Sequence, residues 1–134
     1  MEITIKNLQN KLPINNKKIE KLIRKILKSE KAKPDWINIC FTGNPLIGKL
    51  NKKFLKTTGP TDVLAFNLGS RKNILADIVI STDTAIKQAK AFKTTPQKEL
   101  MLYVAHGILH ILGFDDHTKS QINLMRKKES KYVN

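Results

Sequence analysis

The segment from Leu100 to Phe114 constrains the fold more than any other part of the chain, because it is the most apolar stretch of the sequence. It is shorter than the roughly 20 apolar residues that a helix needs to cross a membrane. Thr95 and Pro96 before it are typical of a helix start, and Gly113 is typical of a helix end. The segment therefore predicts a buried helix at the centre of a globular domain, with no membrane partner.

The remaining segments alternate between strand and helix patterns. Alternation and β-branched runs predict strands at residues 2–6, 36–41, 61–68 and 74–80. Helical spacing predicts helices beginning at Asn15 or Asn16, running from Pro45 to Phe54, running from a cap at residues 81–83 to Phe92, and covering about 120–132. The first helix carries the apolar stripe Ile19, Leu22, Ile23, Ile26 and Leu27. A length of 134 residues predicts that residues 1–134 form a single domain. The sequence does not determine how the last two predicted strands pair.

The chain is strongly basic, with 25 Lys and Arg against 11 Asp and Glu and a formal net charge of +14. Such a charge favours a polyanionic partner, either a nucleic acid or an anionic surface. A genome rich in Lys and Asn codons would produce the same enrichment without such a partner. The charge alone leaves both explanations open.

Two further features bear on the compartment. Cys40 lies within the apolar run 37–41, where a single cysteine is typical of a small core residue in a reducing compartment. The N-terminus alternates apolar and polar residues and lacks the apolar stretch of a signal peptide. We therefore expect a cytoplasmic protein.

The chain has three histidines, and all lie between His106 and His117. On a helix, His106 and His110 project from one face a turn apart, so both imidazoles can reach one ion. Gly113 then allows the chain to turn back and bring His117 to the same point. Three nitrogen ligands with an open fourth position are typical of catalytic zinc, which lowers the pKa of bound water to about 7. The pattern predicts one Zn²⁺ ion per chain and a hydrolase.

The residue after the first histidine bears on the type of hydrolase. Zinc peptidases with the pattern His-Glu-x-x-His use that glutamate as general base, and Gly107 takes its place here. Since a positioned general base contributes about 10²–10⁴ in rate, a peptidase is disfavoured. A phosphodiester needs less from such a base when the metal and cations act on the phosphate.

The histidine segment resembles the signature of the YbeY family, His-Gly-x-Leu-His-x-x-Gly-(Tyr/Phe)-Asp-His. The likeness extends to Leu50-Asn51, to Pro60-Thr-Asp-Val-Leu-Ala-Phe66, to Ala76-Asp-Ile78, and to Met125-Arg126 with Glu129, and so covers most of the chain. The resemblance implies an α+β fold in which a small, mostly parallel sheet packs against helices and the histidine helix lies in the core. It also implies a metal-dependent, single-strand-specific endoribonuclease that matures the 3′ end of 16S rRNA and acts in ribosome quality control. Its partners would be single-stranded RNA, ribosomal RNA precursors and the ribosomal subunit.

The chain departs from the family pattern in three places. The interval between His110 and His117 is one residue longer, because Asp115-Asp116 is doubled. Either the loop absorbs the extra residue, or one of these aspartates supplies a carboxylate ligand to the metal. Leu55 stands where the family usually has an arginine that would face a substrate phosphate. Ala65 and Ala76 replace the usual Ser and Gly, which we regard as minor packing changes.

The basic residues nearest to that missing arginine are the predicted substrate-binding residues: Lys49, Lys52, Lys53 and Lys56. Lys56 is also a candidate catalytic cation, and Asp116 a candidate proton carrier or partner of a metal ligand. The basic residues of the first helix and of residues 126–128 are typical of solvated helix surfaces. A non-catalytic alternative also fits the sequence: a basic RNA-binding or ribosome-binding module in which zinc only stabilises the histidine turn.

Overall fold

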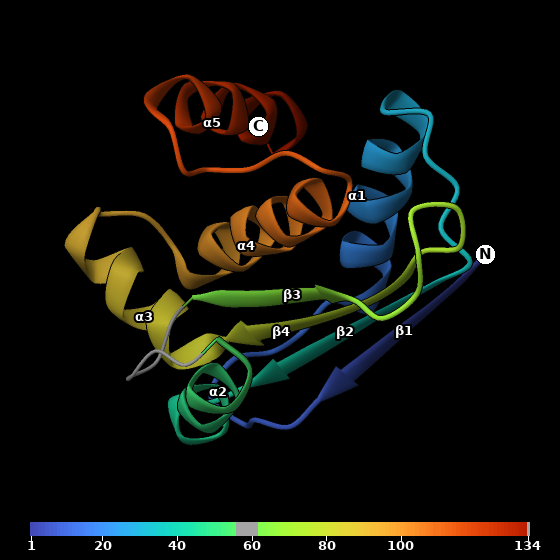
Figure 1. Cartoon of the computed structure of the whole chain (residues 1–134). Coiled ribbons are helices and arrows are strands. Elements are labelled where there is room, and N and C mark those ends of the chain that lie inside the picture. Colours follow the sequence, from blue (N-terminus) through green and yellow to red (C-terminus); the bar gives the residue numbers. More distant parts are fainter. Residues whose placement is uncertain (56–61, 134) are drawn as a thin grey trace.

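The computed structural model describes residues 1–55 and 62–133, and Figure 1 shows the whole chain. The strands are β1 (Glu2–Asn7), β2 (Trp36–Thr42), β3 (Val63–Asn67) and β4 (Leu75–Ser81). The helices are α1 (Asn16–Ser29), α2 (Asn44–Leu50), the π-helical turn η1 (Asn51–Leu55), α3 (Thr82–Ala91), α4 (Pro96–Ile111) and α5 (Lys119–Val133). The predicted α+β class is confirmed, and none of the described helices is long and apolar enough to span a membrane.

The four strands form one sheet in the order β1-β2-β4-β3. β1 pairs with β2, and β2 with β4, in parallel, with Ile5 opposite Ile39 and Ile39 opposite Ile78. β3 pairs antiparallel with β4, with Ala65 opposite Ile78, so these two strands form a hairpin. The sheet is therefore mostly parallel, as the resemblance implied.

The helices cover the two faces of the sheet unequally (Figure 1). α1 and α4 lie on one face, α5 packs on the outer side of α4, and α2 lies on the opposite face. Alternate residues of the central strands point toward α1 and α4 and form the main core with them: Ile37, Ile39, Phe41, Ala76, Ile78 and Ile80. A smaller core under α2 contains Cys40, Ile47, Leu64 and Val79, which confirms Cys40 as a core residue.

The central helix α4 is buried along most of its length, as the sequence predicts. Leu100, Val104 and Ile108 are almost fully inaccessible to solvent. Gly107 faces the sheet, and a Cβ atom there would lie 2.9 Å from Ile78 Cγ2. The absence of a side chain at this position lets α4 approach β4 closely and fixes the height of the histidine face above the sheet.

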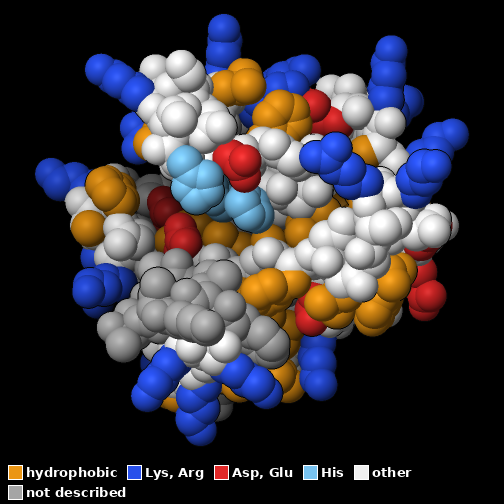
Figure 2. Space-filling view, in the orientation of Figure 1, with side chains coloured by type: hydrophobic (Ala, Val, Ile, Leu, Met, Phe, Trp, Pro, Cys, Tyr) orange, Lys and Arg blue, Asp and Glu red, His pale blue; other side chains and the backbone are white. Residues whose placement is uncertain are grey.

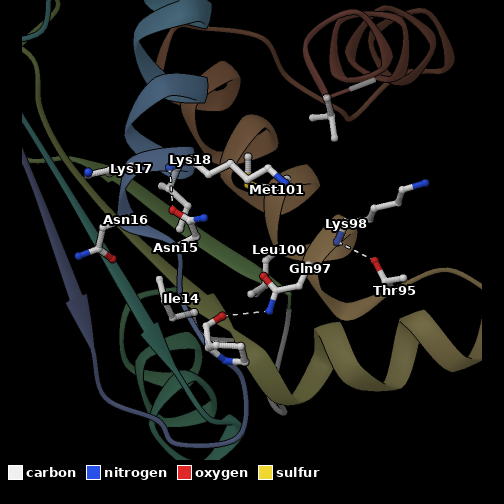
Figure 3. Close-up of a pocket in the computed structure, with 13 residues that line it drawn as sticks. Ile14, Asn15, Asn16, Lys17, Lys18, Thr95, Gln97, Lys98, Leu100 and Met101 are labelled. Atoms are coloured by element: carbon white, nitrogen blue, oxygen red, sulfur yellow. Dashed lines mark hydrogen bonds between the residues drawn. The ribbon is translucent and has the colours of Figure 1, made fainter.

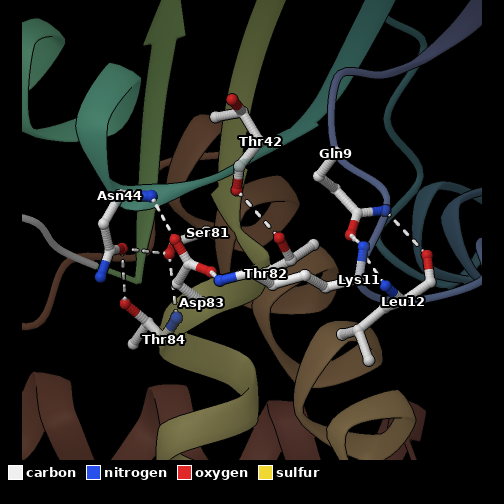
Figure 4. A network of polar contacts seen from close by, with 9 residues as sticks. All are labelled: Gln9, Lys11, Leu12, Thr42, Asn44, Ser81, Thr82, Asp83 and Thr84. Carbon is white, nitrogen blue, oxygen red and sulfur yellow. Dashed lines mark hydrogen bonds and ion pairs between the residues drawn. The ribbon is translucent and has the colours of Figure 1, made fainter.

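A polar network ties the starts of α2 and α3 to the N-terminal segment (Figure 4). The Asp83 carboxylate accepts hydrogen bonds from the Asn44 backbone N–H and from Lys11, each at 2.8 Å. The hydrogen bond from Lys11, followed by that from the Asn44 backbone, lowers the pKa of Asp83 below its ordinary value. Ser81 caps α3 by accepting from the Thr84 N–H at 3.0 Å. These contacts fix the helix starts that follow β2 and β4.

Candidate metal centre

The C-terminal end of α4 places His106 and His110 one turn apart at the surface of an otherwise buried helix. Their side chains are 25% and 39% exposed. The helix ends at Ile111, and the predicted helix stop, Gly113, follows two residues later with a φ of +104°, in the left-handed region that favours glycine. The Gly113 N–H donates to the His110 carbonyl at 3.0 Å, and the Phe114 N–H to the Leu109 carbonyl at 3.1 Å. This pair of bonds is a Schellman motif, which turns the following loop back over the helix end.

Glu129 of α5 holds His106 in a defined orientation. Its Oε2 lies 2.7 Å from His106 Nδ1, which leaves Nε2 as the ring nitrogen able to accept a metal. The hydrogen bond with Glu129 raises the pKa of His106, and partial burial opposes that effect without cancelling it. In the sequence, Glu129 is visible only as part of the family likeness, since no spacing rule links it to a histidine of another helix.

Each of the doubled aspartates faces one helix histidine. Asp116 Oδ2 lies 3.6 Å from His106 Nε2, and Asp115 Oδ1 lies 3.9 Å from His110 Nδ1. Figure 2 shows histidine side chains gathered at one place on the molecular face, next to acidic side chains. The structure therefore brings the candidate proton carrier Asp116 to the histidines.

His117 is the predicted ligand that the structure does not bring into a ligand set. It is exposed, and its backbone N–H donates to Gln121 Oε1 at 3.0 Å, just before α5 begins. Thr118 and Gln121 form a reciprocal cap for that helix, at 3.0 and 3.1 Å. No set of three His, Cys, Asp or Glu side chains in the described part of the chain is arranged to hold a metal ion. The donor chemistry of His106 and His110, with Nδ1 of His106 held by a carboxylate, nonetheless fits zinc.

Comparison with known proteins identifies the family. The family model for Endoribonuclease YbeY matches residues 4–134. The Endoribonuclease YbeY of Chloroherpeton thalassium is 33% identical over 131 residues, covering 98% of this chain and 92% of that protein. That of Petrotoga mobilis is 38% identical over 122 residues, covering 90% and 84%. The chain belongs to the YbeY family.

A solved structure supports the same assignment at the level of the fold. The solution structure of TM1509 from Thermotoga maritima superimposes with a TM-score of 0.70 and is 28% identical in sequence. It covers 99% of this chain and 87% of that one. Membership in the YbeY family supports a nuclease of the hydrolase class, an endoribonuclease.

In this YbeY chain, position 107 cannot carry the glutamate of a zinc peptidase. A Cβ atom at Gly107 would lie 2.9 Å from Ile78 and 3.3 Å from Val63, both on the sheet beneath. A longer side chain there would force α4 away from the sheet, and its carboxylate would be buried among apolar groups. The packing therefore gives a physical reason for the glycine of the family signature.

Three of the four predicted substrate-binding lysines are among the described residues, and they lie on the other side of the sheet from α4. Lys49 is on α2, and Lys52 and Lys53 are on η1, and all three are exposed. α2 packs on β4 and α3, and Figure 1 shows it across the sheet from α4. Lys49 and Lys52 therefore lie across the sheet from the histidines, and Lys56 lies outside the described residues.

A large groove lies at the opposite end of α4 from the histidines. It has a volume of about 1020 Å³ and runs between the N-terminal turns of α1 and α4 and the end of α5, and Figure 3 shows residues that line it. Its lining includes Ile14, Met101 and Lys98 but none of the predicted site residues. The groove is therefore separate from the candidate metal centre.

Proposed function

We propose that the protein is a zinc-dependent endoribonuclease that cuts single-stranded RNA at the C-terminal end of α4. The observation that carries the proposal is the pair His106 and His110 on one face of a buried helix, with His106 Nδ1 held by Glu129 at 2.7 Å, in a chain of the YbeY family. A carboxylate on the far nitrogen of a histidine is the usual support for a metal ligand.

The metal would be held by His106, through Nε2, by His110 and by His117. Zinc bound there supplies a Lewis acid that activates water at neutral pH. For His117 to complete this set, the loop after Gly113 must bring its side chain to the helix pair. The longer interval created by Asp115-Asp116 gives that loop one additional residue with which to do so.

The chain's own residues have separate roles in this proposal. Glu129 fixes the tautomer of His106 and keeps its ring turned outward. Asp116 would hold a proton of the attacking group or the leaving oxygen, a role supported by the 3.6 Å between its Oδ2 and His106 Nε2 and by a side chain that is 43% exposed. Lys49, Lys52, Lys53 and Lys56 would neutralise phosphates of the bound strand, and Lys56 would also serve as the catalytic cation.

The biological substrate we propose is ribosomal RNA precursor, with processing at the 3′ end of 16S rRNA on the ribosomal subunit in the cytoplasm. The net charge of +14 supports a polyanionic substrate of this kind.

The test is cleavage of an end-labelled single-stranded RNA by zinc-loaded protein. The proposal predicts cleavage that a chelator abolishes and that His110→Ala loses. Leu124→Ala, an exposed change on α5, purified in parallel, should cleave as the unchanged protein does. Cleavage that survives both the chelator and His110→Ala would not depend on a metal at the end of α4, and it would overturn the proposal.

The alternative is a non-catalytic module in which zinc only stabilises the histidine turn. It is supported by Leu55, which replaces the family arginine expected to face a substrate phosphate. The two proposals differ in the role of the metal in folding. The main core lies between the sheet, α1 and α4 and includes none of the histidines, so a catalytic zinc can leave without unfolding it. Loss of the far-ultraviolet circular dichroism signal on chelation, together with absence of cleavage, would favour the module.

A further inference from the structure

A small pocket opens beside His106 at the point where α3, α4 and α5 meet. It has a volume of about 310 Å³ and is lined by Phe92, Glu99, Tyr103, His106 and Arg126, among others. This volume corresponds to about ten water molecules at liquid density, enough for one nucleobase but not for a folded RNA element. We call it the Phe92 pocket.

One wall of the Phe92 pocket is an aromatic ring that the fold does not bury. Phe92 caps the end of α3 and is 71% exposed, whereas Phe41 in the core is fully inaccessible. An exposed aromatic beside a nuclease centre provides a flat surface on which an unstacked base of single-stranded RNA can lie.

In the remaining lining, carboxylates outnumber basic side chains, although the protein as a whole is strongly basic. Asp62, Glu99 and Glu129 line the pocket, against Arg126 and His106. Glu129 is bound to His106, whereas Glu99 lies one helical turn before Tyr103, and burial together with the negative charge of Glu99 raises the pKa of the Tyr103 hydroxyl. A carboxylate has two oxygens that accept hydrogen bonds, so Glu99 can accept from a ligand.

The charge of this lining determines whether the phosphate or the base of an RNA nucleotide enters the pocket. Three carboxylates repel a phosphate, so the group inside the pocket is the uncharged base. Cytosine presents an exocyclic amino donor that a carboxylate accepts well. Uracil presents a carbonyl oxygen at the same position, and that oxygen would face a carboxylate.

We propose that the Phe92 pocket binds the base of a nucleotide next to the cleaved bond and prefers bases with an exocyclic amino group over uracil. The base stacks on Phe92 and donates to Glu99, while Arg126, exposed at the rim, contacts an adjoining phosphate. The proposal rests on the proposed nuclease function, because a base in this pocket places its own phosphate beside His106.

Binding and cleavage are measured separately, so that failure of one proposal can be told from failure of the other. Fluorescence anisotropy with a chelator present compares labelled 12-mers of oligocytidylate and oligouridylate on the full chain. The zinc-loaded protein is then assayed for cleavage of both. Because the two strands carry the same phosphate charge, contacts to the backbone alone predict equal affinities.

The expected result is about tenfold tighter binding of oligocytidylate. Glu99→Gln should reduce the preference to about twofold or less, because an amide donates to uracil as readily as it accepts from cytosine. Phe92→Ala should weaken binding of both strands by about tenfold and leave the preference intact. Glu20→Gln on α1 and Leu68→Ala, each an exposed change outside the pocket, are the matched controls and should change neither quantity.

Equal affinity for the two strands, or a preference that Glu99→Gln leaves unchanged, would overturn the pocket proposal even if both strands are cut. A preference that Glu99→Gln removes supports the pocket. If the zinc-loaded protein then cuts neither strand, the nuclease proposal fails and the pocket is a base-binding site of a non-catalytic module.

Discussion

His106 and Glu129 join two helices, because the carboxylate of Glu129 on α5 holds the imidazole ring of His106 on α4. Glu129→Gln keeps the shape of the side chain but removes the charge that orients the ring and raises its basicity. We expect zinc affinity to fall by about 10–100-fold, the usual cost of losing such a partner. Competition against a chromophoric chelator measures it, with Glu20→Gln as control. Unchanged affinity would show that Glu129 does not support a metal ligand.

The identity of the third metal ligand can be tested by substitution. If His117 is that ligand, His117→Ala should lower the zinc affinity more than Asp116→Asn does, and the loss for Asp116→Asn should be about 10–100-fold. Asp116 Oδ2 lies 3.6 Å from His106 Nε2, so Asp116 could be the ligand instead, in which case Asp116→Asn would cause the larger loss of zinc affinity. Isothermal titration of both variants with zinc decides between them. A larger loss for Asp116→Asn would make the third ligand a carboxylate.

At the scale of elements, the end of α4 depends on one backbone conformation. Gly113 has a φ of +104°, and a Cβ atom there would meet nothing within 4 Å. The cost of Gly113→Ala is therefore conformational, and we expect roughly 1 kcal/mol in the free energy of unfolding measured with urea. Gly113→Asn should cost less, because asparagine tolerates the left-handed region. Equal costs for both variants would contradict this explanation.

α5 is fastened to α1 through Glu30, whose side chain is 11% exposed. Burial alone would raise the pKa of Glu30, but hydrogen bonds from Tyr132 and Lys128 outweigh it and lower the pKa below its ordinary value. A carboxyl with a lowered folded pKa stabilises the fold at neutral pH, and this contribution is lost as pH falls through that pKa.

Glu30→Gln should therefore lower the free energy of unfolding by roughly 1–3 kcal/mol at pH 7. The difference from the unchanged protein should shrink below about pH 4, where the carboxyl of the unfolded chain becomes protonated before that of the folded protein. Urea unfolding at several pH values measures it. A difference that stays constant from pH 7 to pH 3 would show that the charge of Glu30 is not what fastens α5.

Sequence periodicity predicted some features of the helices and strands but not others. The apolar stripe of the first helix predicted its buried residues correctly: Ile19, Leu22, Ile23, Ile26 and Leu27. The predicted helix from Pro45 to Phe54 is instead α2 followed by η1, because the spacing of Leu50 and Phe54 is compatible with either winding. The strand order could not be predicted from the sequence, because β4 lies between β2 and β3 in the sheet and parallel pairing joins segments that are far apart in the chain. The Glu129 contact spans two helices and leaves no periodic signal.

At the scale of the whole molecule, the charge distribution predicts how salt affects RNA binding. Lys49 and Lys52 are exposed on the opposite side of the sheet from the histidines. If both contact phosphates, replacing them with Ala should reduce the slope of log affinity against log salt by about 0.7 for each lysine. Lys87→Ala with Lys90→Ala on α3 is the matched control. Equal slopes for both double variants and the unchanged protein would remove this surface from the RNA-binding site.

The most direct test of the central claim is to titrate zinc into metal-free protein while measuring cleavage of one RNA sequence, both as a single strand and annealed to its complement. We predict that single-strand cleavage rises with added zinc and levels off at one ion per chain, that the duplex stays intact, and that His106→Ala and His110→Ala remain inactive throughout. Activity that is independent of zinc, or that survives loss of either histidine, would contradict the account.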